Sequence, residues 1–151
     1  MQMVQESPEM TTSEWELMRI IWTKGKATSS EVSDLIQGKK AWTESTVKTL
    51  LRRLVNKRAL ATEKEGRRFI YLPQVTETEA MDQMTSETFA RICAMKKGQE
   101  LVKLLTETPL SQNDITEMQD ILKQKAKTAP SQVACDCLAD RSQCQANGCC
   151  Q

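Results

Sequence analysis

Apolar residues recur at intervals of three and four in three successive segments of the first 60 residues, and this spacing predicts three short helices. The first helix is expected to end at Gly25 and the second at Gly38, while the third runs to about Lys57. Each begins with a hydroxyl side chain suited to capping, and the first two carry a glutamate three residues later: Ser13 with Glu16, Thr28 with Glu31, and Thr43.

The spacing changes after Leu60, where two short segments rich in strand-forming residues flank Gly66. We predict a two-stranded hairpin that turns at Glu65-Gly66-Arg67. Three short helices followed by a hairpin is the element order of a winged helix-turn-helix domain, in which the third helix reads DNA.

Basic side chains concentrate on the third helix and the hairpin. Residues 41–71 hold eight Lys and Arg against three Glu, a net charge of +5, whereas the whole chain carries only +1. The apolar residues of 44–56 fall on one helix face, which leaves a polar and basic outer face suited to the major groove of double-stranded DNA. The predicted DNA-binding residues are Ser45, Thr46, Lys48, Thr49, Arg52, Arg53, Lys64, Arg67 and Arg68.

Helical spacing returns in the second half of the chain. A long helix is expected from Thr76 to about Lys96, further apolar residues follow Gly98, and Ser111 with Asp114 marks the start of a last helix. These helices span about 50 residues, which is too little chain to bury their own apolar stripes. We therefore predict that this region packs against a second copy and forms a homodimer.

Cysteine is concentrated at one end of the sequence. Five of the six cysteines lie within the last 17 residues, and the chain contains no histidine. Thiolates select Cu(I) or tetrahedral Zn(II), so the cluster favours metal binding over a disulfide scaffold. Cys93 lies among apolar residues of a predicted helix and is interpreted as a packing residue. The predicted metal ligands are Cys135, Cys137, Cys144, Cys149 and Cys150.

These segments divide the chain into three predicted parts: a winged helix DNA-binding domain at 1–74, a helical dimerisation region at 75–128 and a cysteine-rich metal-binding tail at 129–151. The fold class is mainly α with a small β-hairpin wing. We expect the tail to be unordered until it binds metal. No apolar run is long enough to span a membrane and no signal peptide precedes the first helix, so we expect a cytoplasmic protein without a membrane partner.

Several segments are similar to the penicillinase-repressor (BlaI/MecI) family, and the similarity covers nearly the whole chain. They are residues 13–22, Trp42, and residues 46–54. Residues 62–71, Glu79-Ala80-Met81 and Arg91-Ile92-Cys93 resemble the copper-responsive, CopY-type members of that family.

The resemblance implies a dimeric repressor bound to a palindromic operator of copper-homeostasis genes. It also implies that a zinc-loaded form represses, that Cu(I) displaces zinc and releases the DNA, and that a copper chaperone is a candidate donor of Cu(I). The positions that match the family's DNA contacts are Ser45, Thr46, Thr49 and Arg53, and relatives often carry Lys at the first of them.

The sequence departs from the family pattern at two places. Relatives carry Gly where this chain has Arg58, and a left-handed helix end at that position costs an L-residue about 1 kcal/mol. CopY-type tails end in C-x-C-x4-C-x-C, whereas the cysteines here follow the spacing C-x-C-x6-C-x4-C-C.

Other functions are weighed against this interpretation. No nucleophile–base pair, phosphate loop or acid dyad is present, so an enzyme is not expected. A repressor of the same fold that senses zinc or cadmium remains open, as does a metallothionein-like copper-buffering protein. A buffer has no need for Lys48, Arg52 and Arg53 on one helix face, and a repressor that responds to β-lactams has no need for a thiolate tail.

Overall fold

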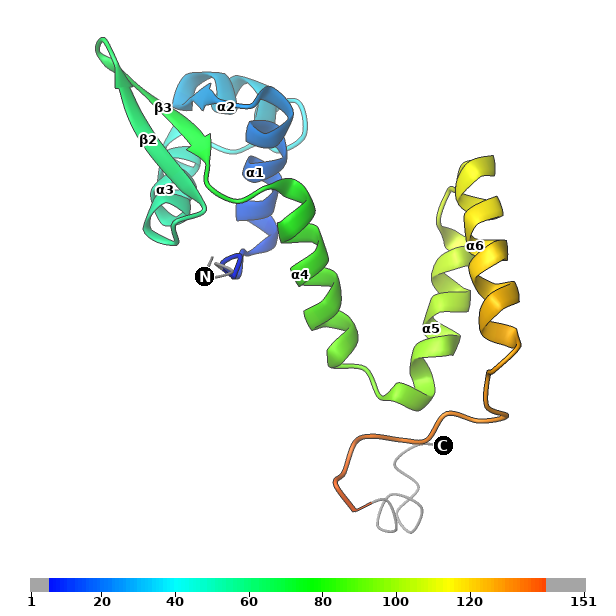
Figure 1. Cartoon of the computed structure of the whole chain (residues 1–151). Coiled ribbons are helices and arrows are strands. Elements are labelled where there is room, and N and C mark those ends of the chain that lie inside the picture. Colours follow the sequence, from blue (N-terminus) through cyan, green and yellow to red (C-terminus); the bar gives the residue numbers. More distant parts are fainter. Residues whose placement is uncertain (1–5, 141–151) are drawn as a thin grey trace, which may run out of the picture. The chain divides into compact units, whose positions relative to one another are not determined.

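The computed structural model describes residues 6–140, and the chain divides into two compact units, Met1–Glu87 and Thr88–Gln151 (Figure 1). The second unit holds α5 (Ala94–Glu107) and α6 (Gln112–Ala126). The domain boundaries drawn from the sequence stay a prediction. The first unit holds α1 (Thr12–Lys24), β1 (Ala27–Thr28), α2 (Ser29–Gln37), α3 (Glu44–Asn56), β2 (Leu60–Glu65), β3 (Arg68–Pro73) and most of α4 (Glu77–Ala90).

The first unit is built around one apolar core shared by α1, α2, α3 and the sheet. On α3, Val47, Leu50, Leu51 and Leu54 are buried, as the helical wheel predicts. The predicted mainly α fold with a hairpin wing is confirmed. The buried core residues are Leu17, Met18, Ile21, Ala27, Val32, Ile36, Val47, Leu50, Leu51, Leu54, Ala59, Leu60 and Val75.

The sheet has three antiparallel strands in the order β1-β3-β2, one strand more than the predicted hairpin. Glu65 pairs with Arg68 around the turn, where Gly66 adopts a φ of 63° that suits glycine best. The additional strand β1 has only two residues, too few to show an alternating pattern, and Thr28 is both its last residue and the N-cap of α2.

The N-terminus of α1 lies two residues before the predicted one. Thr11 is the N-cap and forms a capping box with Glu14, so the predicted pair of Ser13 and Glu16 is wrong. Both pairs have the required spacing. Glu14 takes the capping role because it is buried where its carboxylate also meets a lysine, whereas the Glu16 carboxylate lies 4.0 Å from Arg19 near the surface.

The C-terminus of α3 closes with a Schellman motif, a paired hydrogen-bond arrangement that ends a helix. The Arg58 N–H donates to the Val55 carbonyl at 3.0 Å, and the Ala59 N–H donates to the Leu54 carbonyl at 3.0 Å. Ala59 and Leu54 are both buried, as the motif's usual hydrophobic contact requires. Arg58 has a φ of 62°, the left-handed conformation expected for a residue at the family's glycine position.

The long helix predicted from Thr76 to about Lys96 is interrupted earlier than expected. α4 ends at Ala90, and Cys93 is the N-cap of α5, which continues through Gly98. A glycine inside an exposed helix costs only about 1 kcal/mol, so Gly98 does not force a break. Thr76 and Ser111 are confirmed as the predicted starts of helices. Their hydroxyl groups accept capping hydrogen bonds from the backbone N–H groups of Glu79 and Asp114.

None of the helices in the described residues is both long enough and apolar enough to cross a membrane. Residues 129–140 contain no helix or strand, and residues 141–151, which include Cys144, Cys149 and Cys150, lie outside the described residues.

Replacing Arg58 by glycine should stabilise the first unit. The substitution relieves the cost of a left-handed L-residue without removing a buried contact, because the Arg58 side chain is exposed. We expect the free energy of unfolding to rise by about 1 kcal/mol in urea denaturation. Arg58→Ala is the matched control, since it removes the charge but keeps Cβ, and it should leave stability unchanged. A gain as large in the alanine variant would assign the effect to charge rather than to backbone conformation.

Candidate nucleic-acid interface and thiol cluster

The outer face of α3 carries the polar side chains that the sequence predicts for DNA reading. Its first turn is fixed by Thr43, whose hydroxyl accepts a hydrogen bond from the Thr46 N–H at 3.2 Å. Because the apolar face of the helix is anchored in the core, the opposite face is presented to solvent. All nine predicted DNA-binding residues, six on α3 and three on the wing, are exposed.

Several of these side chains already make local contacts. The Thr49 hydroxyl donates to the Ser45 carbonyl at 3.0 Å, and the Lys48 ammonium lies 3.1 Å from the Glu44 carboxylate. Exposed pairs of this kind contribute little to stability, so Lys48 can exchange its partner for a phosphate at small cost. Thr49 retains its methyl group and acceptor lone pairs for a base edge.

A groove of about 620 Å³ lies between the outer face of α3 and the sheet. Four of the predicted DNA-binding residues line it: Lys48 and Arg52 from α3, and Arg67 and Arg68 from the wing. Ser45, Thr46, Thr49, Arg53 and Lys64 are exposed but do not line it. The structure therefore brings the helix and wing cations to a single concave surface.

The groove also contains residues that the sequence interpretation missed. Ser29 and Ser30, in the first turn of α2, and Phe69 of β3 are among its lining residues. The signal that could have found the two serines is the capping box at Thr28. It predicts that Ser29 and Ser30 start a helix, and backbone N–H groups at a helix start favour phosphate. Phe69 is 55% exposed on the wing, and no spacing in the sequence distinguishes it from a core residue.

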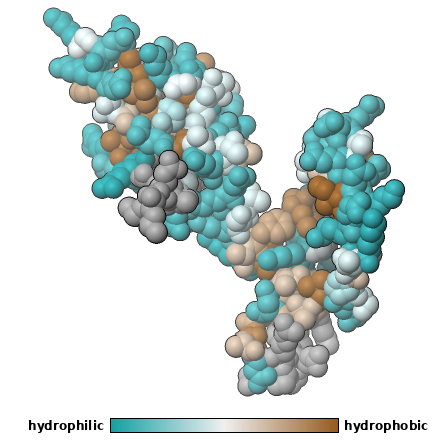
Figure 2. All heavy atoms as spheres, viewed as in Figure 1, coloured by the Kyte–Doolittle hydropathy of each residue, from teal (hydrophilic) through white to brown (hydrophobic). Residues whose placement is uncertain are grey.

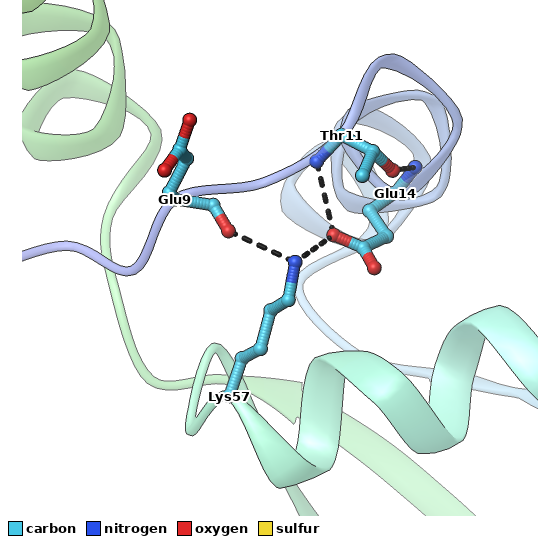
Figure 3. A network of polar contacts seen from close by, with 4 residues as sticks. All are labelled: Glu9, Thr11, Glu14 and Lys57. Carbon is cyan, nitrogen blue, oxygen red and sulfur yellow. Dashed lines mark hydrogen bonds and ion pairs between the residues drawn. The ribbon is translucent and has the colours of Figure 1, made fainter.

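A partly buried ion pair joins α1 to the end of α3 (Figure 3). The Lys57 ammonium lies 2.6 Å from a Glu14 carboxylate oxygen and also donates to the Glu9 carbonyl at 3.0 Å. The same Glu14 oxygen accepts the Thr11 N–H at 3.0 Å. The Glu14 side chain is 1% exposed and the Lys57 side chain 34%, so this pair is shielded from water on the carboxylate side. It holds the C-terminal end of α3 against the start of α1.

The charges around Glu14 decide its protonation. Burial alone would raise the pKa of the carboxyl group, but several contacts outweigh burial and hold the pKa below its ordinary value of 4.5. The largest opposing cause is the hydrogen bond from Lys57, followed by the backbone hydrogen bond from Thr11 and the positive charges of Lys57 and Arg53. Glu14 is therefore ionised at neutral pH, and the capping box and the ion pair act together.

Three thiols meet in the second unit. The Sγ atoms of Cys93, Cys135 and Cys137 all lie within 4.8 Å of one another, and those of Cys93 and Cys135 are 3.5 Å apart. The Cys137 N–H donates to the Cys135 sulfur at 3.4 Å. Among the described residues, no other group of cysteine or carboxylate side chains has three ligand atoms close enough together to hold a metal ion.

The structure corrects the interpretation of Cys93 as a packing residue. Cys93 is half-buried at the turn between α4 and α5, and its sulfur faces the tail cysteines rather than an apolar core. The sequence predicts a single helix from Thr76 to about Lys96, which places Cys93 inside a helix and gives no sign that it lies at a turn. Of the five predicted ligands, Cys135 and Cys137 belong to the cluster, while Cys144, Cys149 and Cys150 lie outside the described residues.

The helices α1, α2 and α3, the three-stranded antiparallel sheet and the exposed outer face of α3 define a winged helix domain in the first unit. The sequence profile of the penicillinase repressor family matches residues 10–124, and the chain belongs to this family of transcriptional repressors, not to a class of enzymes.

The chain is also similar to individual proteins. The chain is 51% identical over 143 residues to an uncharacterized 16.5 kDa protein of Latilactobacillus sakei, covering 95% of this chain and 98% of that protein. It is 28% identical over 117 residues to the penicillinase repressor of Bacillus licheniformis, covering 78% and 91% of the two chains. A solved structure of the CopR repressor is 45% identical, covering 44% of this chain and 97% of that one, with a TM-score of 0.40.

Replacing Glu14 by glutamine should destabilise the first unit, because Lys57 then loses its charged partner while the Thr11 cap keeps an oxygen acceptor. We expect the free energy of unfolding at pH 7 to fall by about 1.5–3 kcal/mol. Glu16→Gln is the matched control on the same helix, where the ion pair is long and near the surface, and it should change stability by less than about 0.5 kcal/mol.

The pH dependence gives this prediction a second measurement. A carboxyl group with a lowered pKa in the folded state stabilises the fold above its unfolded pKa, and the contribution is lost as pH falls from about 4.5 through the folded pKa. The stability difference between the wild-type chain and Glu14→Gln should therefore shrink below that pH. A difference that stays constant down to acid pH would show that the ion pair does not carry it.

Proposed function

We propose that the chain is a copper-responsive transcriptional repressor. As a dimer, it binds a palindromic operator of copper-homeostasis genes in a zinc-loaded form and leaves the DNA when Cu(I) replaces zinc. The observation that carries this proposal is the presence, in one repressor chain, of an exposed basic face on α3 and a cluster of three thiols in the second unit.

The DNA-binding part is supported by the arrangement of cations. Arg52 and Lys48 on α3 share a groove with Arg67 and Arg68 of the wing, so the chain offers contacts to base edges and to the neighbouring phosphates from one surface. Phosphate contacts supply most of the affinity, while side chains on the outer face of α3 supply base preference. A copper buffer, the alternative from another class, has no use for this surface.

The metal part is supported by the chemistry of the donors. Three thiols with no histidine anywhere in the chain form a soft donor set, and Cu(I) accepts two or three sulfur ligands. Metal–sulfur bonds of about 2.3 Å place sulfur atoms about 4 Å apart, so small shifts adapt the cluster to an ion. Tetrahedral Zn(II) needs one ligand more than the cluster provides, and this difference in coordination number is the basis for discriminating the two ions.

The dimer is supported by the surface of the second unit. Neither α5 nor α6 has a buried residue, although both carry large apolar side chains, and hydrophobic residues are visible beside α5 in Figure 2. A second copy supplies the burial that the chain does not provide by itself. The apolar side chains left exposed on these two helices are Met95, Leu101, Val102, Leu104, Leu105, Ile115, Ile121 and Leu122. A cytoplasmic location follows from the proposal, because its partner is operator DNA.

Arg53→Ala should weaken operator binding and relax base preference, because Arg53 is exposed on α3 and matches a base-contacting position in the family. Loss of a specific contact costs about 1–3 kcal/mol. Arg67→Ala in the wing is the contrasting variant. It should weaken binding to operator and random DNA alike and make the salt dependence shallower. Fluorescence anisotropy on both DNAs over a range of salt concentrations measures the two effects, and equal losses on both DNAs for Arg53→Ala would contradict its role as a base reader.

Replacing Cys135 and Cys137 together by serine should abolish release of operator DNA by copper. The substitution removes two of the three clustered thiols and leaves the winged helix unit unchanged. The measurement is anisotropy of labelled operator DNA during Cu(I) titration of the zinc-loaded full-length chain. Ser131→Ala in the same segment is the control and should respond as the wild-type chain does. Release by zinc or cadmium but not by Cu(I) would favour the alternative zinc or cadmium sensor.

A further inference from the structure

We propose that Cys93 is a metal ligand, and that the thiolate site is therefore shared between the tail and the turn that joins α4 to α5. The proposal deepens the proposed function and rests on it for the identity of the ion, Cu(I). It assigns to the helical region a ligand that the tail spacing alone does not indicate.

The first support is the distance between sulfur atoms far apart in the sequence. Cys93 and Cys135 are separated by 42 positions, yet their Sγ atoms are 3.5 Å apart, and Cys137 completes a triangle with all three atoms within 4.8 Å. Two thiols from a C-x-C segment provide only two ligands. The third thiol comes from Cys93, and three thiolates complete a trigonal Cu(I) site.

The second support is a contact that involves no sulfur. The Asp136 carboxylate accepts a hydrogen bond from the Ala94 N–H at 2.8 Å. Cys93 is the N-cap of α5 but makes no side-chain capping bond of its own, so Asp136 supplies the cap from the tail. The backbone between Cys135 and Cys137 is thus held at the start of α5 independently of any metal.

The position of Cys93 is fixed by the helices on either side of it. α4 ends at Ala90, and the Cys93 carbonyl accepts the Lys96 N–H at 2.8 Å in the first turn of α5. The start of a helix also favours negative charge, which suits a group of thiolates. A metal ion bound here would close a loop that contains α5, α6 and the linker after α6, and would tie the tail to the end of α4.

This arrangement gives the tail a means of acting on the helical region. A site made only of tail cysteines would order the tail and nothing else. A site that includes Cys93 makes the turn between α4 and α5 part of the coordination sphere, so metal identity bears on the helices that follow the DNA-binding unit.

Binding of Cu(I) to the full-length, reduced chain tests the proposal directly. Affinity is measured by competition with a chromophoric Cu(I) chelator in the absence of DNA. Cys93→Ala should lower Cu(I) affinity by more than about 10-fold, because loss of even an outer-shell partner of a ligand costs about 10- to 100-fold. Cys93→Ser serves as the second variant, and the helical circular dichroism of both verifies that they fold. Gln99→Ala is the matched control, because it shortens an exposed side chain on the same helix that belongs neither to the thiol cluster nor to the apolar surface, and it should bind Cu(I) as the wild-type chain does.

Alkylation of the wild-type chain gives a readout that needs no variant. Cu(I) should protect Cys93 from alkylation together with Cys135 and Cys137, as detected by mass spectrometry. Wild-type affinity in both Cys93 variants, or alkylation of Cys93 in the copper-loaded chain, would overturn the proposal. A Cys93–Cys135 disulfide that persists under reductant and blocks Cu(I) binding would overturn it as well. Because DNA is absent from these measurements, their outcome does not depend on the proposed function. If Cu(I) bound through Cys93 but did not release operator DNA in the anisotropy titration, only the proposed function would be overturned.

Discussion

The ion pair between Glu14 and Lys57 constrains the orientation of α3. It joins the capped start of α1 to the end of α3, and the neighbouring Schellman motif directs the chain from that point into the sheet. The core fixes which face of α3 is buried, and the charged hydrogen bond from Lys57 to Glu14 adds a directional contact at the C-terminal end of the helix. With α3 held in this way, cations of α3 and of the hairpin line one groove. The conformation of Arg58 and the protonation of Glu14 therefore bear on the placement of α3, although neither side chain lines the groove.

Much of the first unit was predictable from local pattern. Thr28, Thr43 and Gly66 each satisfy a local rule, since a cap or a turn depends on a few consecutive residues. The buried face of α3 followed from its spacing. What failed depended on distant partners. The sequence offers two equivalent capping boxes at the start of α1, and only the position of Lys57, 43 residues further on, decides that Glu14 is used. Strand β1 exists because β3 is there to pair with it.

Cys93 shows the same limit more clearly. Its neighbours in the sequence are apolar, and by pattern it belongs inside a helix. Its role becomes visible only when the chain returns 42 positions later and places Cys135 beside it, with Asp136 capping α5. The two units thus obtain their order in different ways. The first is stabilised by its own core, whereas neither α5 nor α6 contains a buried residue. In our account a second copy and a metal ion supply the missing contacts, which is why stability in this region is also the means of control.

The central claim is that metal binding in the second unit and DNA binding by the first are thermodynamically coupled. Coupling is reciprocal: if Cu(I) weakens operator binding by some factor, operator DNA must weaken Cu(I) binding by the same factor. The most direct measurement is therefore the Cu(I) affinity of the zinc-loaded, full-length chain, determined by chelator competition with and without saturating operator DNA. The account predicts weaker Cu(I) binding on the operator, by about 5- to 150-fold for coupling of ordinary strength, and no change with random DNA. The same Cu(I) affinity with and without the operator would contradict it.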